Sequence, residues 1–165
     1  MKQQRLSPND FYDILESPLG PLYLIFTSGL LSSIAFSKTS GILLKRKEGM
    51  TRARDELIEY FKKARQEFTC QTVFIEGTDF EKKVWETLKG IPYGETRTYK
   101  WLAEKIGKPN AFRAVGNALG KNPIPIIFPC HRVIETDGSI GGYSGGVDIK
   151  RRLLEIEYYT IRSKD

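Results

Sequence analysis

The sequence predicts an α+β fold, with a small antiparallel sheet and one helix over residues 1–77 and a mostly helical domain over residues 78–165. Over residues 11–36, short apolar runs rich in strand formers alternate with turn-forming residues, which is typical of a meander of strands. Beyond residue 77, apolar residues recur at helical spacing in short segments that glycine and proline separate. The hydrophobic share of 40% is sufficient for a packed core in a chain of 165 residues.

The N-terminal part is expected to hold a meander, a helix and one further strand. Three strands are predicted at residues 11–16, 22–27 and 30–36, with turn-forming residues between them. Residues 51–66 follow as a helix, because apolar residues fall there at helical spacing with charges elsewhere. Residues 68–77 are expected to add one more strand and a connector to the second domain.

The C-terminal part is expected to be built from short helices. Thr78 is predicted to cap the first of them, with acidic residues in its first turn, where negative charge suits the helix dipole. The next two helices, over residues 98–106 and 111–119, flank a tight break and match the helix-turn-helix pattern. A last helix is expected over residues 147–158.

The second helix of this pair consists mostly of small residues. Its only long polar side chains are Arg113 and Asn117, whereas a helix that reads the major groove normally carries several. A close fit in the minor groove, with one long side chain projecting, therefore suits the sequence better. The alternative is that the small residues allow close packing against another helix. These small residues are Ala111, Ala114, Gly116, Ala118 and Gly120.

The charge of the chain favours a polyanionic partner. The formal net charge is +6, and residues 97–121 contain six basic residues against the single acidic residue Glu104. A local excess of this kind is what a surface that contacts phosphates needs. The alternative is an ordinary solvated helix surface.

Targeting to a membrane and a Cys/His zinc centre are not expected. No apolar run reaches the roughly 18 residues that cross a bilayer, and the first residues lack the apolar core of a signal peptide. We therefore expect the protein to be cytoplasmic. Cys70, Cys130 and His131 are the only Cys and His residues, which is fewer than a tetrahedral zinc site requires. No metal, cofactor or structural disulfide is expected.

Residues 122–133 carry the strongest sign of chemistry. Three prolines alternate with apolar residues, which predicts an extended, rigid and largely buried path that ends at Cys130 beside His131. A cysteine is nucleophilic as the thiolate, and it needs a nearby base or positive charge, which His131 and Arg132 could supply. Adjacent side chains of an extended chain point to opposite faces, so Cys130 and His131 would communicate through a bend or a water. A buried inert thiol and a structural histidine are the alternatives.

Two further segments complete the predicted site. A third group should orient the imidazole, and the acids of the last helix, Glu155 and Glu157, are the candidates. Residues 141–146 are rich in glycine but lack the lysine and spacing of a P-loop. They are better interpreted as a flexible pocket wall, in which Tyr143 and Ser144 offer an aromatic face and hydroxyls.

At residues 129–133, Pro-Cys-His-Arg-Val, the sequence resembles the O6-alkylguanine-DNA alkyltransferases. The resemblance is strong from about residue 80 to residue 158 and looser in the N-terminal part. It implies an RNase H-like N-terminal domain before the helix-turn-helix and the active-site loop. The matching segments, in family order and spacing, also include residues 91–96, 113–116, 122–125 and 142–146.

The resemblance implies a role for individual positions. Cys130 is the alkyl acceptor, His131 acts on it as a base through a water, and Glu157 rather than Glu155 holds the histidine. Asn122 braces the turn before the active-site strand. Tyr99 helps to rotate the nucleotide, and Arg113 fills the gap that the extruded base leaves. Val133, Tyr143, Ser144 and Gly145 contact the guanine or line its pocket, and Ala114, Asn117, Lys121 and Arg132 contact the DNA.

The implied activity is irreversible, stoichiometric transfer of the alkyl group from O6-alkylguanine in double-stranded DNA to Cys130, by a monomer without cofactors. O4-alkylthymine is a second candidate substrate. The damaged base must leave the helical stack to reach the cysteine. A non-enzymatic helix-turn-helix protein that binds alkylated DNA is the main alternative, and a cysteine hydrolase is another. The first leaves the Pro-Cys-His-Arg segment unexplained, and the second gives no reason for the basic helix pair.

Overall fold

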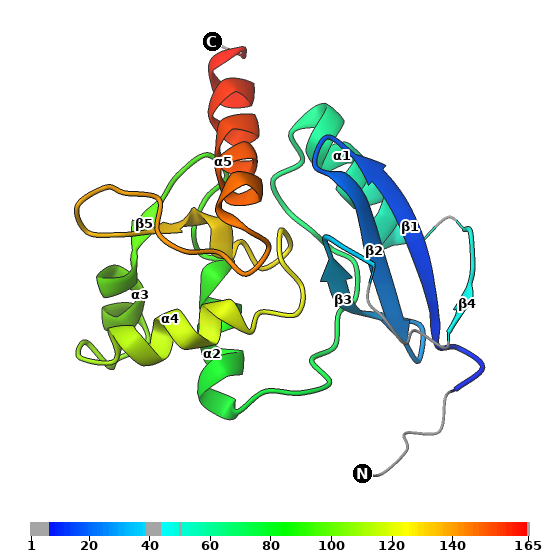
Figure 1. The fold of residues 1–165 in the computed structure, drawn as a ribbon, viewed down its shortest axis with the longest axis horizontal. Helices are drawn as coiled ribbons and strands as arrows, with labels where there is room; N and C mark the ends of the chain where they lie inside the picture. Colours follow the sequence, from blue (N-terminus) through cyan, green and yellow to red (C-terminus); the bar gives the residue numbers. More distant parts are fainter. Residues whose placement is uncertain (1–6, 39–43, 50, 165) are drawn as a thin grey trace. The chain divides into compact units, whose positions relative to one another are not determined.

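The computed structural model describes residues 7–38, 44–49 and 51–164. It divides into two compact units, Met1–Ile75 and Glu76–Asp165, and each is described by itself (Figure 1). The first unit holds the sheet and one helix, and the second holds the remaining helices. Within the described residues, no helix is both long enough and apolar enough to span a membrane.

The first unit is built on the predicted meander. Strands β1 (Phe11–Ser17), β2 (Gly20–Thr27) and β3 (Leu30–Ala35) pair antiparallel in sequence order. Alternate residues of β2 are buried, as expected for a strand with one face on a core. A short strand, β4 (Lys45–Arg46), adds to β1 in parallel, so the sheet has the order β3-β2-β1-β4 and is mixed rather than purely antiparallel. Two paired residues are too few to leave a pattern in the sequence.

Helix α1 (Arg52–Lys63) lies against one face of this sheet (Figure 1). Thr51 caps its start through a side-chain bond from Arg54 N, and it ends three residues before the predicted boundary because Ala64 adopts a left-handed conformation. On the buried face of α1, Glu56 is 3% exposed. Its carboxylate accepts hydrogen bonds from the backbone amides of Thr69 and Cys70, both at 2.9 Å.

The strand predicted within residues 68–77 is wrong, because this segment pairs with the sheet at one position only. Thr72 forms an isolated bridge with Leu31. In this bridge, Leu31 N donates to Gln71 O at 3.2 Å, and Leu31 O accepts from Val73 N at 2.9 Å. The preceding amides, those of Thr69 and Cys70, point to Glu56 instead of to a neighbouring strand. The Glu56 carboxylate therefore accepts hydrogen bonds from amides that the predicted strand would have paired with a neighbouring strand.

The second unit contains the predicted helices. A capping box between Thr78 and Glu81 starts α2 (Asp79–Leu88). Helices α3 (Tyr99–Lys105) and α4 (Phe112–Gly120) form the helix-turn-helix, and α5 (Val147–Arg162) ends the unit, four residues longer than predicted. Trp85 Nε1 donates to Ala118 O at 2.7 Å, which ties α2 to α4. A two-residue parallel pair, β5 (Arg97–Thr98) with β6 (Val133–Ile134), was not predicted.

Residues 122–130 do not form the predicted extended strand. They follow a buried series of turns that leads into a 3-10 turn, η1 (Cys130–Arg132). Asn122 decides this path, since its Oδ1 accepts from Ile124 N at 3.1 Å and its Nδ2 donates to Phe128 O at 2.8 Å. Ile126 has a φ of 73°, a strained conformation for a β-branched residue that the surrounding packing must hold in place.

Candidate active site

Cys130 lies at the start of the 3-10 turn, and its side chain is almost completely buried, with 4% exposure. Asn122 Nδ2, which also holds Phe128 O, lies 3.1 Å from Cys130 Sγ and can donate to the thiolate. Burial raises the pKa of the Cys130 thiol, while hydrogen bonds from Asn122 and Tyr143 and the positive charge of Lys150 oppose that rise. The site therefore contains the groups that a buried thiolate needs.

His131 is fully buried beside Cys130 and is held by Glu157. The distance from its Nε2 to Glu157 Oε1 is 2.7 Å, so we assign the imidazole proton to Nε2. Burial lowers the pKa of His131, which keeps the ring neutral and leaves Nδ1 as a proton acceptor. This Nδ1 is buried and has no hydrogen-bond partner among the described residues. A histidine in this state can accept a proton from a neighbouring thiol.

Glu157 is the centre of a buried polar network. Besides His131, it accepts from Arg132 Nε at 3.0 Å, Arg132 Nη2 at 2.9 Å and Gly94 N at 3.0 Å. Burial alone would raise the pKa of Glu157, but the hydrogen bonds from His131 and Arg132, with the charge of Arg132, lower it. Glu157 therefore stays ionised. The other candidate acid, Glu155, is exposed on the same helix.

Arg132 is part of this network, which corrects the expectation that it contacts DNA. Its side chain is 5% exposed, and its Nη1 donates to Ile91 O at 2.7 Å while Nε and Nη2 hold Glu157. None of these groups can reach a phosphate without breaking a buried ion pair. The sequence shows the charge of Arg132 but not that a carboxylate 25 residues away lies opposite it.

A pocket of about 240 Å³ opens onto Cys130. Tyr99 from α3 forms part of its wall, and burial, followed by the charges of Glu135 and Cys130, raises the pKa of its hydroxyl. Gly141 has a φ of 72°, which strains residues with a side chain, and a Cβ there would lie only 3.2 Å from Tyr99 Oη, so both features favour glycine. The lining residues are Tyr99, Gly116, Leu119, Gly120, Cys130, Gly142, Tyr143 and Ser144.

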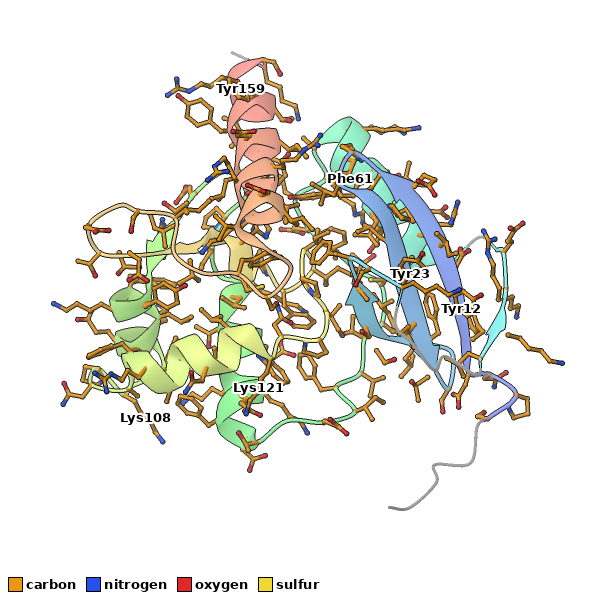
Figure 2. The ribbon with its side chains drawn as sticks, viewed as in Figure 1. Tyr12, Tyr23, Phe61, Lys108, Lys121 and Tyr159 are labelled. Carbon is orange, nitrogen blue, oxygen red and sulfur yellow. The ribbon has the colours of Figure 1, made fainter. Side chains whose placement is uncertain are left out.

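The remaining predicted residues do not line the pocket, and several of them lie on the surface of the helix-turn-helix. Val133 is fully buried, and neither Val133 nor Gly145 belongs to the pocket lining. On α4, the side chains of Arg113, Ala114 and Asn117 are exposed. Figure 2 shows two lysines near the ends of α4, Lys108 and Lys121, and Lys121 forms an exposed ion pair with Glu81 at 2.7 Å.

Lys150 is a residue of this site that the sequence analysis did not identify. Its side chain is fully buried, and its Nζ donates to Val133 O at 2.7 Å and to Gly142 O at 3.2 Å. The sequence did contain a signal, because Lys150 falls at helical spacing with Leu153 and Glu157, and these three residues form the buried stripe of α5. Within the described residues, no cluster of three or more His, Cys, Asp or Glu could hold a metal ion.

A helix-turn-helix beside a pocket with a buried Cys-His-Glu arrangement is what we expect of a DNA-binding protein that uses a cysteine as a nucleophile. The model of the 6-O-methylguanine DNA methyltransferase DNA-binding domain matches residues 79–159. The methylated-DNA–protein-cysteine methyltransferase of Methanosarcina barkeri is 45% identical over 92% of this chain and 99% of its own length. That of Mycobacterium tuberculosis is 42% identical over 88% of this chain and 91% of its own. The chain belongs to the methylated-DNA–protein-cysteine methyltransferase family.

Solved structures agree with this assignment. The crystal structure of Mycobacterium tuberculosis OGT in complex with DNA is 42% identical, with a TM-score of 0.82 over 90% of this chain and 93% of that one. The O6-methylguanine-DNA methyltransferase of Pyrococcus kodakaraensis is 28% identical, with a TM-score of 0.70 over 89% of this chain and 99% of that one. These similarities span both units of the chain.

Proposed function

We propose that this protein repairs double-stranded DNA by transferring the alkyl group of O6-alkylguanine to its own Cys130. The observation that carries the proposal is the position of Cys130, which lines a 240 Å³ pocket while its neighbour His131 is held by Glu157. A base inside the duplex cannot reach a thiol in such a pocket, so it must first be rotated out of the stack, at a cost of a few kcal/mol.

The exposed face of α4 is suited to the DNA. Its small residues allow a close approach to the minor groove, where Ala114 and Asn117 would contact the duplex and Lys121 a phosphate. Arg113 projects from the same helix and would occupy the space that the rotated base vacates, which offsets part of the unstacking cost. Arg132 has no part in this surface, because Glu157 holds it in the interior.

The buried network would generate the nucleophile. We assign His131 Nδ1 the role of accepting the Cys130 thiol proton through one water, while the Glu157 carboxylate fixes the ring and favours its protonated form. Asn122 would hold the resulting thiolate through its Nδ2, 3.1 Å from the sulfur. Arg132 acts indirectly, since it keeps Glu157 ionised and in position.

The transfer is an in-line displacement at the alkyl carbon. The bond from Cys130 Sγ to this carbon forms as the bond from the carbon to guanine O6 breaks, and the electron pair of the broken bond goes to the guanine. Tyr99, whose hydroxyl stays protonated at neutral pH, would donate a proton to the leaving base. The Ser144 hydroxyl and backbone groups at Val133 would recognise the guanine edge. The product thioether is a poor leaving group, so one molecule repairs one lesion.

An intact-mass measurement tests this proposal. A duplex that contains one O6-methylguanine should add one methyl group to the protein, limited to one equivalent, and the Cys130→Ser variant should gain none. Cys70→Ser is the matched control and should react like the wild type. Binding of the duplex without any mass gain would refute transfer and would favour the non-enzymatic alternative. The same experiment with O4-methylthymine tests the second substrate.

The domain organisation and the location follow from the same reasoning. We propose a functional boundary near residue 77, because every side chain of the candidate site comes from beyond it. We also propose that the protein acts as a monomer on the chromosome, in the cytoplasm at the nucleoid, since its substrate is the duplex itself.

A further inference from the structure

Lys150 is an unusual residue for the interior of a protein. Its side chain is completely buried in the first turn of α5, and no carboxylate of the described residues lies within ion-pair distance of its Nζ. A buried ammonium without a carboxylate is costly unless other groups stabilise it. Two backbone carbonyls and the ring of Tyr99, 5.9 Å from Nζ to the centroid, are the groups that surround it.

The two carbonyls belong to different segments beside the proposed base pocket, one next to the turn of Cys130 and one on a loop that lines the pocket. Val133 directly follows the 3-10 turn that carries Cys130, and its oxygen accepts from Lys150 Nζ at 2.7 Å. Gly142 lies on the loop that residues 135–146 form, which we call the 135–146 loop. Its oxygen accepts from Lys150 Nζ at 3.2 Å. Lys150 therefore ties this loop to the segment that holds the nucleophile.

The backbone of the 135–146 loop bonds mainly to itself. Its backbone hydrogen bonds run within the loop, from Glu135 N to Ser139 O, from Gly138 N to Glu135 O and from Gly146 N to Tyr143 O. These bonds shape the loop, and its links to the active-site turn come from Lys150 and from Tyr143, which hydrogen-bonds Cys130. Gly142, Tyr143 and Ser144 nevertheless line the pocket, so the position of this loop decides the shape of the pocket.

The charges around Lys150 also connect this residue with Cys130. The groups that interact electrostatically with its Nζ are the thiolate form of Cys130 and the Glu135 carboxylate, while His131, Tyr99 and Tyr143 lie near the same site and remain neutral. Burial lowers the pKa of Lys150, and the Cys130 and Glu135 anions oppose this. The positive charge of Lys150 is therefore most stabilising when Cys130 is ionised.

We propose that Lys150 is a positioning residue that fastens the 135–146 loop to the active-site turn and places a positive charge beside Cys130. This inference rests on the proposed alkyl transfer, which gives the lysine its role. The experiments that test it do not require that transfer. The lysine holds the pocket wall through its two hydrogen bonds, and its charge stabilises the thiolate that attacks the alkyl group.

Iodoacetamide, a small thiol reagent, tests the inference without DNA or alkylguanine. In a folded Lys150→Met variant, the profile of Cys130 alkylation against pH should move to higher pH, with a rate about tenfold lower at pH 7, because an opposite charge nearby favours ionisation. Lys150→Arg keeps the charge and should recover most of the rate. Arg151→Met, an exposed neighbour on α5, is the control and should match the wild type. An unshifted profile in folded Lys150→Met overturns the proposal.

Hydrogen exchange of the 135–146 loop tests whether Lys150 fastens this loop to the active-site turn. The loop amides should exchange faster in Lys150→Met than in Arg151→Met, and equal protection overturns the proposal. If Lys150→Met does not fold, the titration of Lys150 Nζ in the wild type, followed by NMR, replaces both tests. It should move to lower pH once iodoacetamide has capped Cys130, because the neighbouring thiolate is lost. If the titration of Lys150 does not move, Lys150 does not place its charge beside Cys130. If the iodoacetamide and exchange results are as expected but methyl transfer fails, only the proposed function is refuted.

Discussion

Replacing Arg132 by methionine should destabilise the second unit by about 3–5 kcal/mol, because it leaves a buried carboxylate without its cationic partner. Methionine keeps much of the apolar stem of the side chain, so the change removes mainly charge and hydrogen bonds. The lost bonds are those to Glu157, from Nη2 at 2.9 Å and from Nε at 3.0 and 3.2 Å, and the one to Ile91 O at 2.7 Å. Glu157 would retain His131 and the amide of Gly94.

The pH dependence gives a second signature of the same variant. The pKa of Glu157 is lower in the folded protein than the value of about 4.3 in an unfolded chain. The ionised carboxylate therefore adds stability above that pH, and this stability is lost as the pH falls below it. Without Arg132, the folded pKa of Glu157 rises towards the unfolded value. The difference in unfolding free energy between wild type and variant should therefore shrink below about pH 4.

Urea unfolding followed by tryptophan fluorescence is the appropriate assay. Trp85 and Trp101 are the only tryptophans, and both belong to the second unit, so the signal reports on that unit. Arg151→Met is the matched control, because its ion pair with Asp148 is exposed and contributes at most about 1 kcal/mol. If Arg132→Met unfolds like this control and instead weakens duplex binding, Arg132 is a DNA contact and the buried network is wrong.

Three further predictions concern the site and its surroundings. Arg113→Ala should slow repair of O6-methylguanine in duplex DNA by about tenfold or more, since tenfold corresponds to only about 1.4 kcal/mol of the rotation cost. Reaction with free O6-benzylguanine should hardly change, and equal losses on both substrates would rule out the role of Arg113 in the duplex. Asn122→Ala removes a donor to Cys130 Sγ and should shift the iodoacetamide profile to higher pH, while destabilising the turn by about 1–3 kcal/mol; an unshifted profile would contradict the thiolate contact. Cys70→Ala should leave methyl transfer intact, because Cys70 belongs to the first unit, and loss of transfer in a folded protein would refute this.

Those parts of the fold that follow local rules could be predicted from the sequence. The strands of the meander emerge from alternation and turn residues, and the capping box of Thr78 and Glu81 marks the start of α2. The pairs β5 with β6 and β1 with β4 could not be predicted, because two residues per strand leave no period. The turns over residues 122–130 were missed for another reason. Proline favours an extended chain locally, but Asn122 supplies bonds to the backbone that only this folded path can satisfy.

The sequence alone was enough to predict Cys130 as the nucleophile with its histidine neighbour, the helix pair and, through the resemblance, the choice of Glu157. These features lie in short segments whose residue types and spacing carry the information. The tertiary structure decided the role of charged side chains. Arg132 was expected on the DNA and lies in the interior, and Lys150, which was not predicted for the site, is buried with its Nζ bonded to Val133 O and Gly142 O. Whether a long cation is exposed or buried depends on partners that are distant in sequence, such as Glu157 for Arg132 and Val133 for Lys150, 25 and 17 residues away. Local propensity contains no information on such partners, because the cost of removing a charge from water is offset only after the chain has folded.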